Sequence, residues 1–213
     1  MRTRYALTGL IATVAVLVPF TTSLGGSHTW RVTELFSNSD RTVQFIELGE
    51  CCGFPDETAL LNKPVSSNTN VFILPANLPA GSTANAHILL GTAAYAALPG
   101  APAPDHIISQ EFFDLVADQI DYSVWDDLPY GPGDLPTNGK DSLNKDPSTG
   151  VLSTGPNSPT NFDGVSGNVD ACPWDLDADG VVGIVDFLEL LGNWNNPYTI
   201  VDFLDLLGSW GGC

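Results

Sequence analysis

The chain has few positive charges, because 7 lysine and arginine residues stand against 25 aspartate and glutamate residues, giving a formal net charge of −18. Nucleic acids and anionic membrane surfaces are negatively charged, so they repel such a chain, whereas cations are attracted to it. The sequence also lacks a nucleophile elbow, an HExxH motif, a phosphate-binding loop and a CxxC pair. We therefore expect no nucleic-acid partner and no enzymatic activity.

No apolar run is long enough for a membrane span. The run at the N-terminus extends from Tyr5 to Phe20 and contains Pro19, whereas a spanning helix needs roughly 20 apolar residues. Two arginines precede this run and small residues follow it, an arrangement typical of a secretory signal peptide. We expect residues 1–27 to be that signal, and the mature protein to be extracellular or attached to the cell surface, without a membrane span.

Cysteine is scarce, with four residues in the chain. An exported protein can form disulfides, but four cysteines allow three pairings and the sequence does not choose among them. Cys172 and Cys213 bracket the acidic C-terminal region, so a disulfide between them is attractive. The adjacent Cys51 and Cys52 are either part of such a framework or a pair of free or locally oxidised thiols in a turn.

Short β-rich runs dominate the chain from Trp30 to about Asp146. Runs such as TVQFIEL and AHILLG alternate with turns such as LPGAPAP and YGPGDLPTNG, a pattern typical of a β-sandwich or barrel. One exception is TAAYAALPG, where Thr92 can cap a short helix. Residues 147–169 are rich in Ser, Thr, Gly, Pro and Asn, and we expect them to be a linker or an outer strand, partly docked, with a true linker beginning near Gly167.

A twelve-residue stretch after Trp174 has acidic side chains at the spacing of a calcium loop. Calcium takes roughly six to eight oxygen ligands, which such a loop supplies from positions 1, 3, 5, 7 and 12, with glycine at position 6. The alternative is a solvated acidic turn, which would not require four aspartates at the ligand positions of a calcium loop around Gly180. The predicted ligands of one calcium ion are the side chains of Asp175, Asp177, Asp179 and Asp186 and the backbone carbonyl of Val181.

The apolar segment that follows the acidic loop occurs a second time, but the acidic loop does not. IVDFLDLLGSW (200–210) matches IVDFLELLGNW (184–194) at nine of eleven positions, but the loop before Asp202 has neither acids nor glycine where a metal needs them. A single loop–helix unit cannot bury its own apolar stripe, so we expect the second helix to cover the first. The predicted contact joins Phe187, Leu188, Leu190, Leu191 and Trp194 to Phe203, Leu204, Leu206, Leu207 and Trp210.

DLDADGVVGIVDFLELLGNW resembles one repeat of a type I dockerin, the small calcium-dependent module of secreted bacterial proteins. Dockerins usually have two such segments and present a near-twofold surface, whereas this chain has one orthodox segment. The resemblance implies a truncated, EF-hand-like dockerin module over residues 170–213. It also implies docking to a cohesin-type protein, or attachment to a cell-surface component.

WRVTELFSNSDRTVQFIEL resembles the opening of a lamin-tail-type domain, and DQIDYSVWDDLPYGPGDLPTNGKDSLNKD resembles its last hairpin, with Asn138 in place of an aspartate. Such domains are immunoglobulin-like β-sandwiches that serve as binding or structural modules. The resemblance implies a mainly β fold: a lamin-tail-like sandwich over residues 28–166, followed by the small α-helical module. The layout also resembles that of uncharacterised exported bacterial proteins.

Two alternative functions remain open. Glu34 with Glu47, or Asp105 with His106, would be the carboxylate pair or dyad of a hydrolase, although strand pairing for the first pair and a surface turn for the second are the favoured explanations. A carbohydrate-binding module of a polysaccharide-degrading system is the stronger alternative. Its ring-stacking residues would be Tyr122, Trp125 and Tyr130, although at least one of the first two is expected in the core.

Overall fold

The computed structural model describes residues 25–79, 81–177 and 179–212. Most of the predicted signal peptide therefore lies outside the described residues. Its last residues are part of the folded body, since the N–H of Gly26 donates to the carbonyl of Asp56 (2.8 Å) and the Tyr122 hydroxyl donates to the carbonyl of Ser27 (2.9 Å). Among the described helices, none has the length and apolar character needed to cross a membrane.

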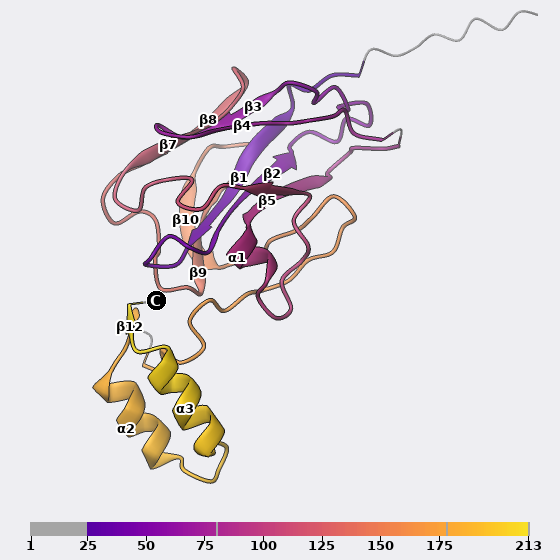
Figure 1. Cartoon of the computed structure of the whole chain (residues 1–213). Coiled ribbons are helices and arrows are strands. Elements are labelled where there is room, and N and C mark those ends of the chain that lie inside the picture. Colours follow the sequence, from indigo (N-terminus) through magenta and orange to yellow (C-terminus); the bar gives the residue numbers. More distant parts are fainter. Residues whose placement is uncertain (1–24, 80, 178, 213) are drawn as a thin grey trace, which may run out of the picture.

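The fold is mainly β, as predicted, and the described strands form several sheets (Figure 1). All neighbouring strands run antiparallel except β5 and β6, which are parallel. The largest sheet has the order β10-β9-β1-β2-β5-β6, built from β1 (Trp30–Ser37), β2 (Gln44–Glu50), β5 (His87–Thr92), β6 (His106–Ile108), β9 (Asp141–Lys145) and β10 (Leu152–Pro156). The second has the order β4-β3-β7-β8, built from β3 (Pro64–Ser66), β4 (Val71–Ile73), β7 (Asp118–Tyr122) and β8 (Asp126–Tyr130).

The two large sheets share one apolar core. Val32 and Leu35 of β1 lie in the same fully buried cluster as Ile120 of β7 and Leu128 of β8. Along β7 and β8 buried and exposed residues alternate, because successive side chains of a strand point to opposite faces. The inner face of these two strands is therefore largely apolar, whereas their outer face is mostly polar.

A second cluster covers the other side of the six-stranded sheet. Helix α1 (Ala93–Ala96) begins at Thr92, whose hydroxyl accepts the N–H of Tyr95 (3.2 Å), so the predicted cap is confirmed. The Tyr95 ring packs edge-on against Phe45, with the ring centroids 5.3 Å apart. Because both faces of β2 are covered, every residue of that strand is buried.

The polar segment 147–169 docks along the body. Its strand β10 pairs with β9, which confirms the expectation of an outer strand. The linker expected near Gly167 is wrong, because Val169 is buried and exchanges two hydrogen bonds with the side chain of Asn157, at 2.7 and 2.8 Å. The side-chain amide of Asn157 thus holds the backbone of a segment whose composition predicted a linker.

The C-terminal tail forms a small unit of its own at one end of the body (Figure 1). Helices α2 (Ile184–Gly192) and α3 (Ile200–Gly208) form where the apolar repeat predicts helices, and the short strands β11 (Val181–Val182) and β12 (Gly211–Gly212) pair beside them. The Phe187 and Phe203 rings meet between the helices, with centroids 5.7 Å apart.

The predicted helix contact is only partly correct. Leu190 and Leu206 are fully buried and Phe187 and Phe203 are half-buried. The other predicted contact residues stay largely exposed, because two short helices meet along one stripe and leave their remaining apolar positions at the surface. These exposed residues are Leu188, Leu191, Trp194, Leu204, Leu207 and Trp210.

Candidate metal site

Three of the predicted calcium ligands lie together in the tail. Carboxylate oxygens of Asp175, Asp177 and Asp186 are all within 4.8 Å of one another. Asp175 and Asp186 are buried, whereas Asp177 is exposed, so the group opens to solvent on one side. The fourth predicted carboxylate, Asp179, is not part of this group.

The loop curls around the side chain of Asp175. One carboxylate oxygen of Asp175 accepts the N–H of Asp179 (3.0 Å), and the other accepts the N–H of Gly180 (3.0 Å). Gly180 has a φ of 89°, a left-handed conformation that glycine adopts without steric cost. The glycine predicted at position 6 therefore permits the sharp turn that brings the loop back on itself.

Asp186 joins the loop to the first turn of α2. Its carboxylate accepts the N–H of Gly183 (2.6 Å) at the start of the helix and the N–H of Leu176 (2.6 Å) from the loop. Burial raises the pKa of Asp186, but these backbone donors more than offset it, so the pKa lies below its ordinary value. The carboxylate is thus held ionised at the positive end of the helix.

The exposed side of the site is electrostatically crowded. Partial desolvation, together with the nearby carboxylates of Asp179, Asp186 and Asp175, raises the pKa of Asp177. The carboxylate of Asp179 turns back to its own backbone and accepts the N–H of Val181 (2.9 Å). Val181 itself lies in β11, at the position whose carbonyl was predicted as a ligand.

The four aspartates have no basic side chain paired with them in the described part of the chain, where every ion pair lies between residues 28 and 145. The ammonium of Lys140 donates to the backbone carbonyl of Asp175 (2.7 Å) and so fixes the base of the loop to the body. A donor set made of oxygens alone, with excess negative charge, fits a hard divalent cation such as Ca²⁺. The ligand group is therefore compatible with the predicted metal.

The corresponding part of the second repeat serves as a helix cap. The carboxylate of Asp202 accepts both the N–H (2.6 Å) and the hydroxyl (2.7 Å) of Thr199, and these bonds lower its pKa. The N–H of Asn195, which has a φ of 65°, donates to the carbonyl of Tyr198 (2.7 Å) in a tight turn. This turn connects α2 directly to α3.

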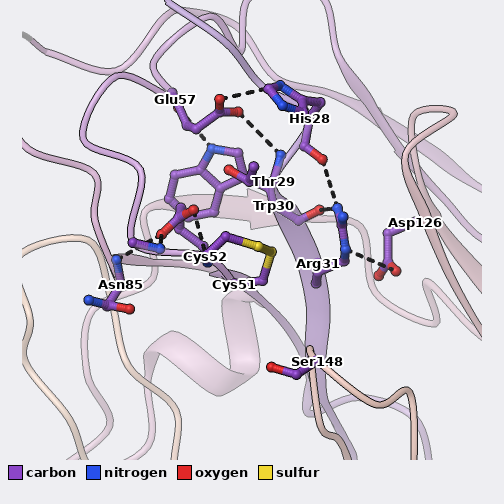
Figure 2. Close-up of a disulfide and its surroundings, with 12 residues drawn as sticks. His28, Thr29, Trp30, Arg31, Cys51, Cys52, Glu57, Asn85, Asp126 and Ser148 are labelled. Atoms are coloured by element: carbon purple, nitrogen blue, oxygen red, sulfur yellow. Dashed lines mark hydrogen bonds and ion pairs between the residues drawn. A yellow bond between two sulfur atoms is a disulfide. The ribbon is translucent and has the colours of Figure 1, made fainter.

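Cys51 and Cys52 form a disulfide with each other at the end of β2 (Figure 2). The buried carboxylate of Glu50 supports this corner by accepting the N–H groups of Cys52 (3.1 Å) and Gly53 (2.8 Å). Thiolates bind metals, whereas disulfide sulfurs do not, so this corner is not a metal site while it is oxidised. The predicted partner of Cys172 is Cys213, which lies outside the described residues, so that pairing stays a prediction.

Two of the three predicted sugar-stacking residues are in the core. Tyr122 is fully buried and Tyr130 is 6% exposed, and their hydroxyls donate to the backbone carbonyls of Ser27 and Asp114. Burial raises the pKa of both phenols, and neither ring presents a face to solvent. Trp125 remains a candidate because 45% of it is exposed.

The carboxylates considered for catalysis are engaged in holding the body together. Glu34 and Glu47 are direct partners across β1 and β2, and they accept backbone N–H groups of Ser158 (2.8 Å) and Thr160 (2.7 Å) from the covering segment. The Glu47 carboxylate also lies 2.9 Å from Nδ1 of His87.

Asp105 has a comparable position at the edge of the six-stranded sheet. Its carboxylate accepts the N–H groups of Leu89 (2.8 Å) and Phe162 (3.0 Å). The same oxygen, Oδ2, accepts both N–H groups and so joins two backbone segments. The role that this geometry supports is structural.

Comparisons of the chain with protein families, curated proteins and solved structures gave no match. What the protein does must therefore follow from its own residues and their arrangement.

Proposed function

We propose that this is a secreted, non-catalytic protein in which an immunoglobulin-like β-sandwich carries a truncated, dockerin-like tail that binds one calcium ion and docks to a protein partner. The convergence of Asp175, Asp177 and Asp186 from two parts of the tail carries this proposal. A solvated acidic turn would spread such charges apart, because like charges repel.

In this proposal the calcium ion has a structural role. Asp175 and Asp177 come from the loop, while Asp186 comes from helix α2, so an ion bound to all three joins the loop to the helix. A small reorientation of Asp179, together with the carbonyl of Val181 and water, would complete a shell of roughly six to eight oxygens. Bound metal offsets the repulsion among the carboxylates and so stabilises the tail.

The tail also presents an apolar surface that a partner could cover. Five apolar positions in α2 and just after it recur sixteen residues later in and after α3, and all ten residues are between 36% and 61% exposed. Apolar patches of this kind mark interaction sites on soluble proteins. This docking surface consists of Ile184, Val185, Leu188, Leu191 and Trp194, with Ile200, Val201, Leu204, Leu207 and Trp210.

The negative charge of the tail limits which proteins could bind its apolar surface. From Asp170 onward the chain has eight acidic residues and no basic one. A second copy would bring these like charges together, whereas an apolar surface rimmed by lysine and arginine would complement them. The dockerin resemblance supports a cohesin-type domain as that partner, with a cell-surface component as the other possibility.

Calcium titration by calorimetry tests the metal. We expect one site in the intact protein, lost in Asp177→Ala and retained in Asp202→Ala, because Asp202 occupies the helix position equivalent to Asp186 but serves only as a cap. Two comparable sites would show that the second repeat also binds metal. Binding that survives Asp177→Ala would contradict the ligand set.

Binding to a panel of purified cohesin-type domains tests the docking. We expect the intact protein to bind such a domain only in the presence of calcium. A charge introduced into the docking surface, in Leu188→Asp or Leu204→Asp, should abolish the binding, because these leucines are 58% and 59% exposed. The control is Val116→Asp, which changes an equally exposed apolar residue of the body. Binding that persists in both tail variants would place the interface elsewhere.

A further inference from the structure

The turn between β7 and β8 forms a shallow hollow of about 340 Å³ on the outer face of the smaller sheet. This volume is at the lower end of the roughly 300–1,000 Å³ of small-molecule sites. Its walls contain one aromatic ring and a set of hydrogen-bonding side chains. The hollow is lined by Gln119, Asp121, Ser123, Val124, Trp125, Asp126 and Asp127.

Strand alternation places the polar groups on this outer face. Ile120, Tyr122 and Leu128 point into the core, so Gln119, Asp121 and Asp127 lie on the opposite face. Asp121 and Asp127 are direct partners across the two strands. Like charges in that position destabilise a sheet, so the core offers no reason for this pair.

The three carboxylates of the hollow differ in the hydrogen bonds that they already accept. The amide of Gln119 donates to Asp121 (2.7 Å), which orients that carboxylate. Asp126 is already held by the ammonium of Lys145 (2.6 Å) and by the N–H of Val32 (2.7 Å), so it anchors the hairpin. The exposed carboxylate of Asp127 accepts no hydrogen bond within the described part of the chain, and both its oxygens are open to a ligand.

Trp125 supplies the apolar wall of the hollow. Its backbone N–H donates to the carbonyl of Tyr122 (3.1 Å), and its ring lies against the edge of the His28 ring, 6.1 Å away. The ring is thus positioned by the turn while 45% of the residue stays exposed. A flat apolar surface beside hydrogen-bond acceptors matches a sugar ring, which has an apolar C–H face and hydroxyls around its edge.

We infer that this hollow binds a neutral saccharide, with a sugar ring stacked on Trp125 and its hydroxyls donating to Asp121 and Asp127. The row of outward positions continues from Asp121 to Ser66 and Val71 on β3 and β4, so a chain of several sugars can lie across the sheet. Uronate and sulfate groups are excluded, because the hollow has carboxylates and no basic lining residue. This site goes beyond the docking function and does not depend on it.

Isothermal titration of the intact protein with neutral hexasaccharides (β-1,4-glucan, β-1,3-glucan, xylan and mannan) and with hexagalacturonate tests the inference. We expect at least one neutral saccharide to bind and the hexagalacturonate not to bind. Trp125→Ala should weaken the binding at least tenfold and Asp127→Ala at least threefold. Trp125→Phe, which keeps a flat ring, should retain most of the affinity.

Phe54→Ala is the matched control, because Phe54 is an aromatic residue that is 52% exposed and does not line the hollow. Thermal unfolding verifies that each variant is folded. The inference is overturned if no neutral saccharide binds, if the acidic one binds equally well, or if Trp125→Ala stays within twofold of the unaltered protein.

Discussion

In the β body, nineteen buried apolar residues from both large sheets and their connecting segments form one core, whereas the core of the tail contains four. The tail has instead its densest acidic group in a loop next to two short helices. A unit of this size cannot bury enough apolar surface to be stable by packing alone, so small modules depend on metals or disulfides. One chain thus contains a part that its own packing can stabilise and a part that needs a further source of stability.

Removing calcium should separate the two parts most strongly. In excess chelator we expect proteases to cut within residues 170–212 at least tenfold faster, because the carboxylates of the loop then repel one another. The body should resist as before, since all the proposed metal ligands lie in the tail. Limited proteolysis followed by mass spectrometry measures both rates, and equal resistance of the tail with and without calcium would count against the metal.

Truncating a buried leucine in the tail should have the next largest effect. Leu206 is fully buried and Leu204 is 59% exposed on the same helix. We expect Leu206→Ala to lower the free energy of unfolding of the tail by about 2–4 kcal/mol, and Leu204→Ala by less than about 0.5 kcal/mol. Hydrogen exchange of the α2 and α3 amides in calcium measures this difference, and similar losses in both variants would show that the helix orientation is wrong.

Asn157, which is 2% exposed, holds in place the segment that leads from the body into the tail. Its side chain donates to the carbonyls of Lys140 (2.6 Å) and Val169 (2.7 Å) and accepts the N–H of Val169. Asn157→Ala removes the side-chain partners of the N–H and the carbonyl of Val169, whereas the Lys140 carbonyl still accepts the backbone N–H of residue 157 (3.2 Å). We therefore expect a loss of about 1–3 kcal/mol in the stability of the body. Chemical denaturation measures it, with Asn168→Ala, a more exposed neighbour with one such bond, as the milder comparison.

Lowering the pH should stabilise the body and destabilise the tail, and this is the smallest of the expected effects. The hydrogen bond to Glu47 raises the pKa of His87 above 6.5, so its stabilising contribution is full below pH 6.5 and is lost as pH rises through the raised value. The pKa of Asp186 and that of Asp202 lie below 3.8, so their contribution is present above that pH and is lost as pH falls further.

Denaturation of the body at pH 6 and pH 8 tests the first half of this contrast. Between pH 8 and pH 6 we expect the free energy of unfolding of the unaltered protein to rise by a few tenths of a kcal/mol more than that of His87→Gln. The value is small because the His87 side chain is 37% exposed and solvent screens the interaction. An identical pH response in the variant would show that the Glu47 contact does not contribute.

Features encoded locally could be predicted from the sequence. The Thr92 cap depends on one hydroxyl and the next turn of backbone, and the spacing of Asp175, Asp177 and Asp186 defines a loop that a few hydrogen bonds close. The existence of α2 and α3 follows from apolar periodicity within each segment. Each of these signals spans a dozen residues or fewer, so no distant part of the chain can reverse it.

Features that depend on distant contacts could not be predicted. Alternation along β7 and β8 shows that Tyr122 and Tyr130 share a face, but the opposing sheet decides that this face is buried. Val169 lies in a segment with the composition of a linker, and the side chain of Asn157 holds it in place. The exposure of Leu188 and Leu204 depends on how far two helices overlap, which periodicity does not specify.

The bond between Cys51 and Cys52 has one further consequence. A crosslink between sequence neighbours encloses no segment of chain, so it barely reduces the number of conformations open to the unfolded protein. Reducing agents would therefore soften one corner of the body without weakening the whole. The stability of the body is a property of its sheets, and the bond between Cys51 and Cys52 confers stiffness at a single point.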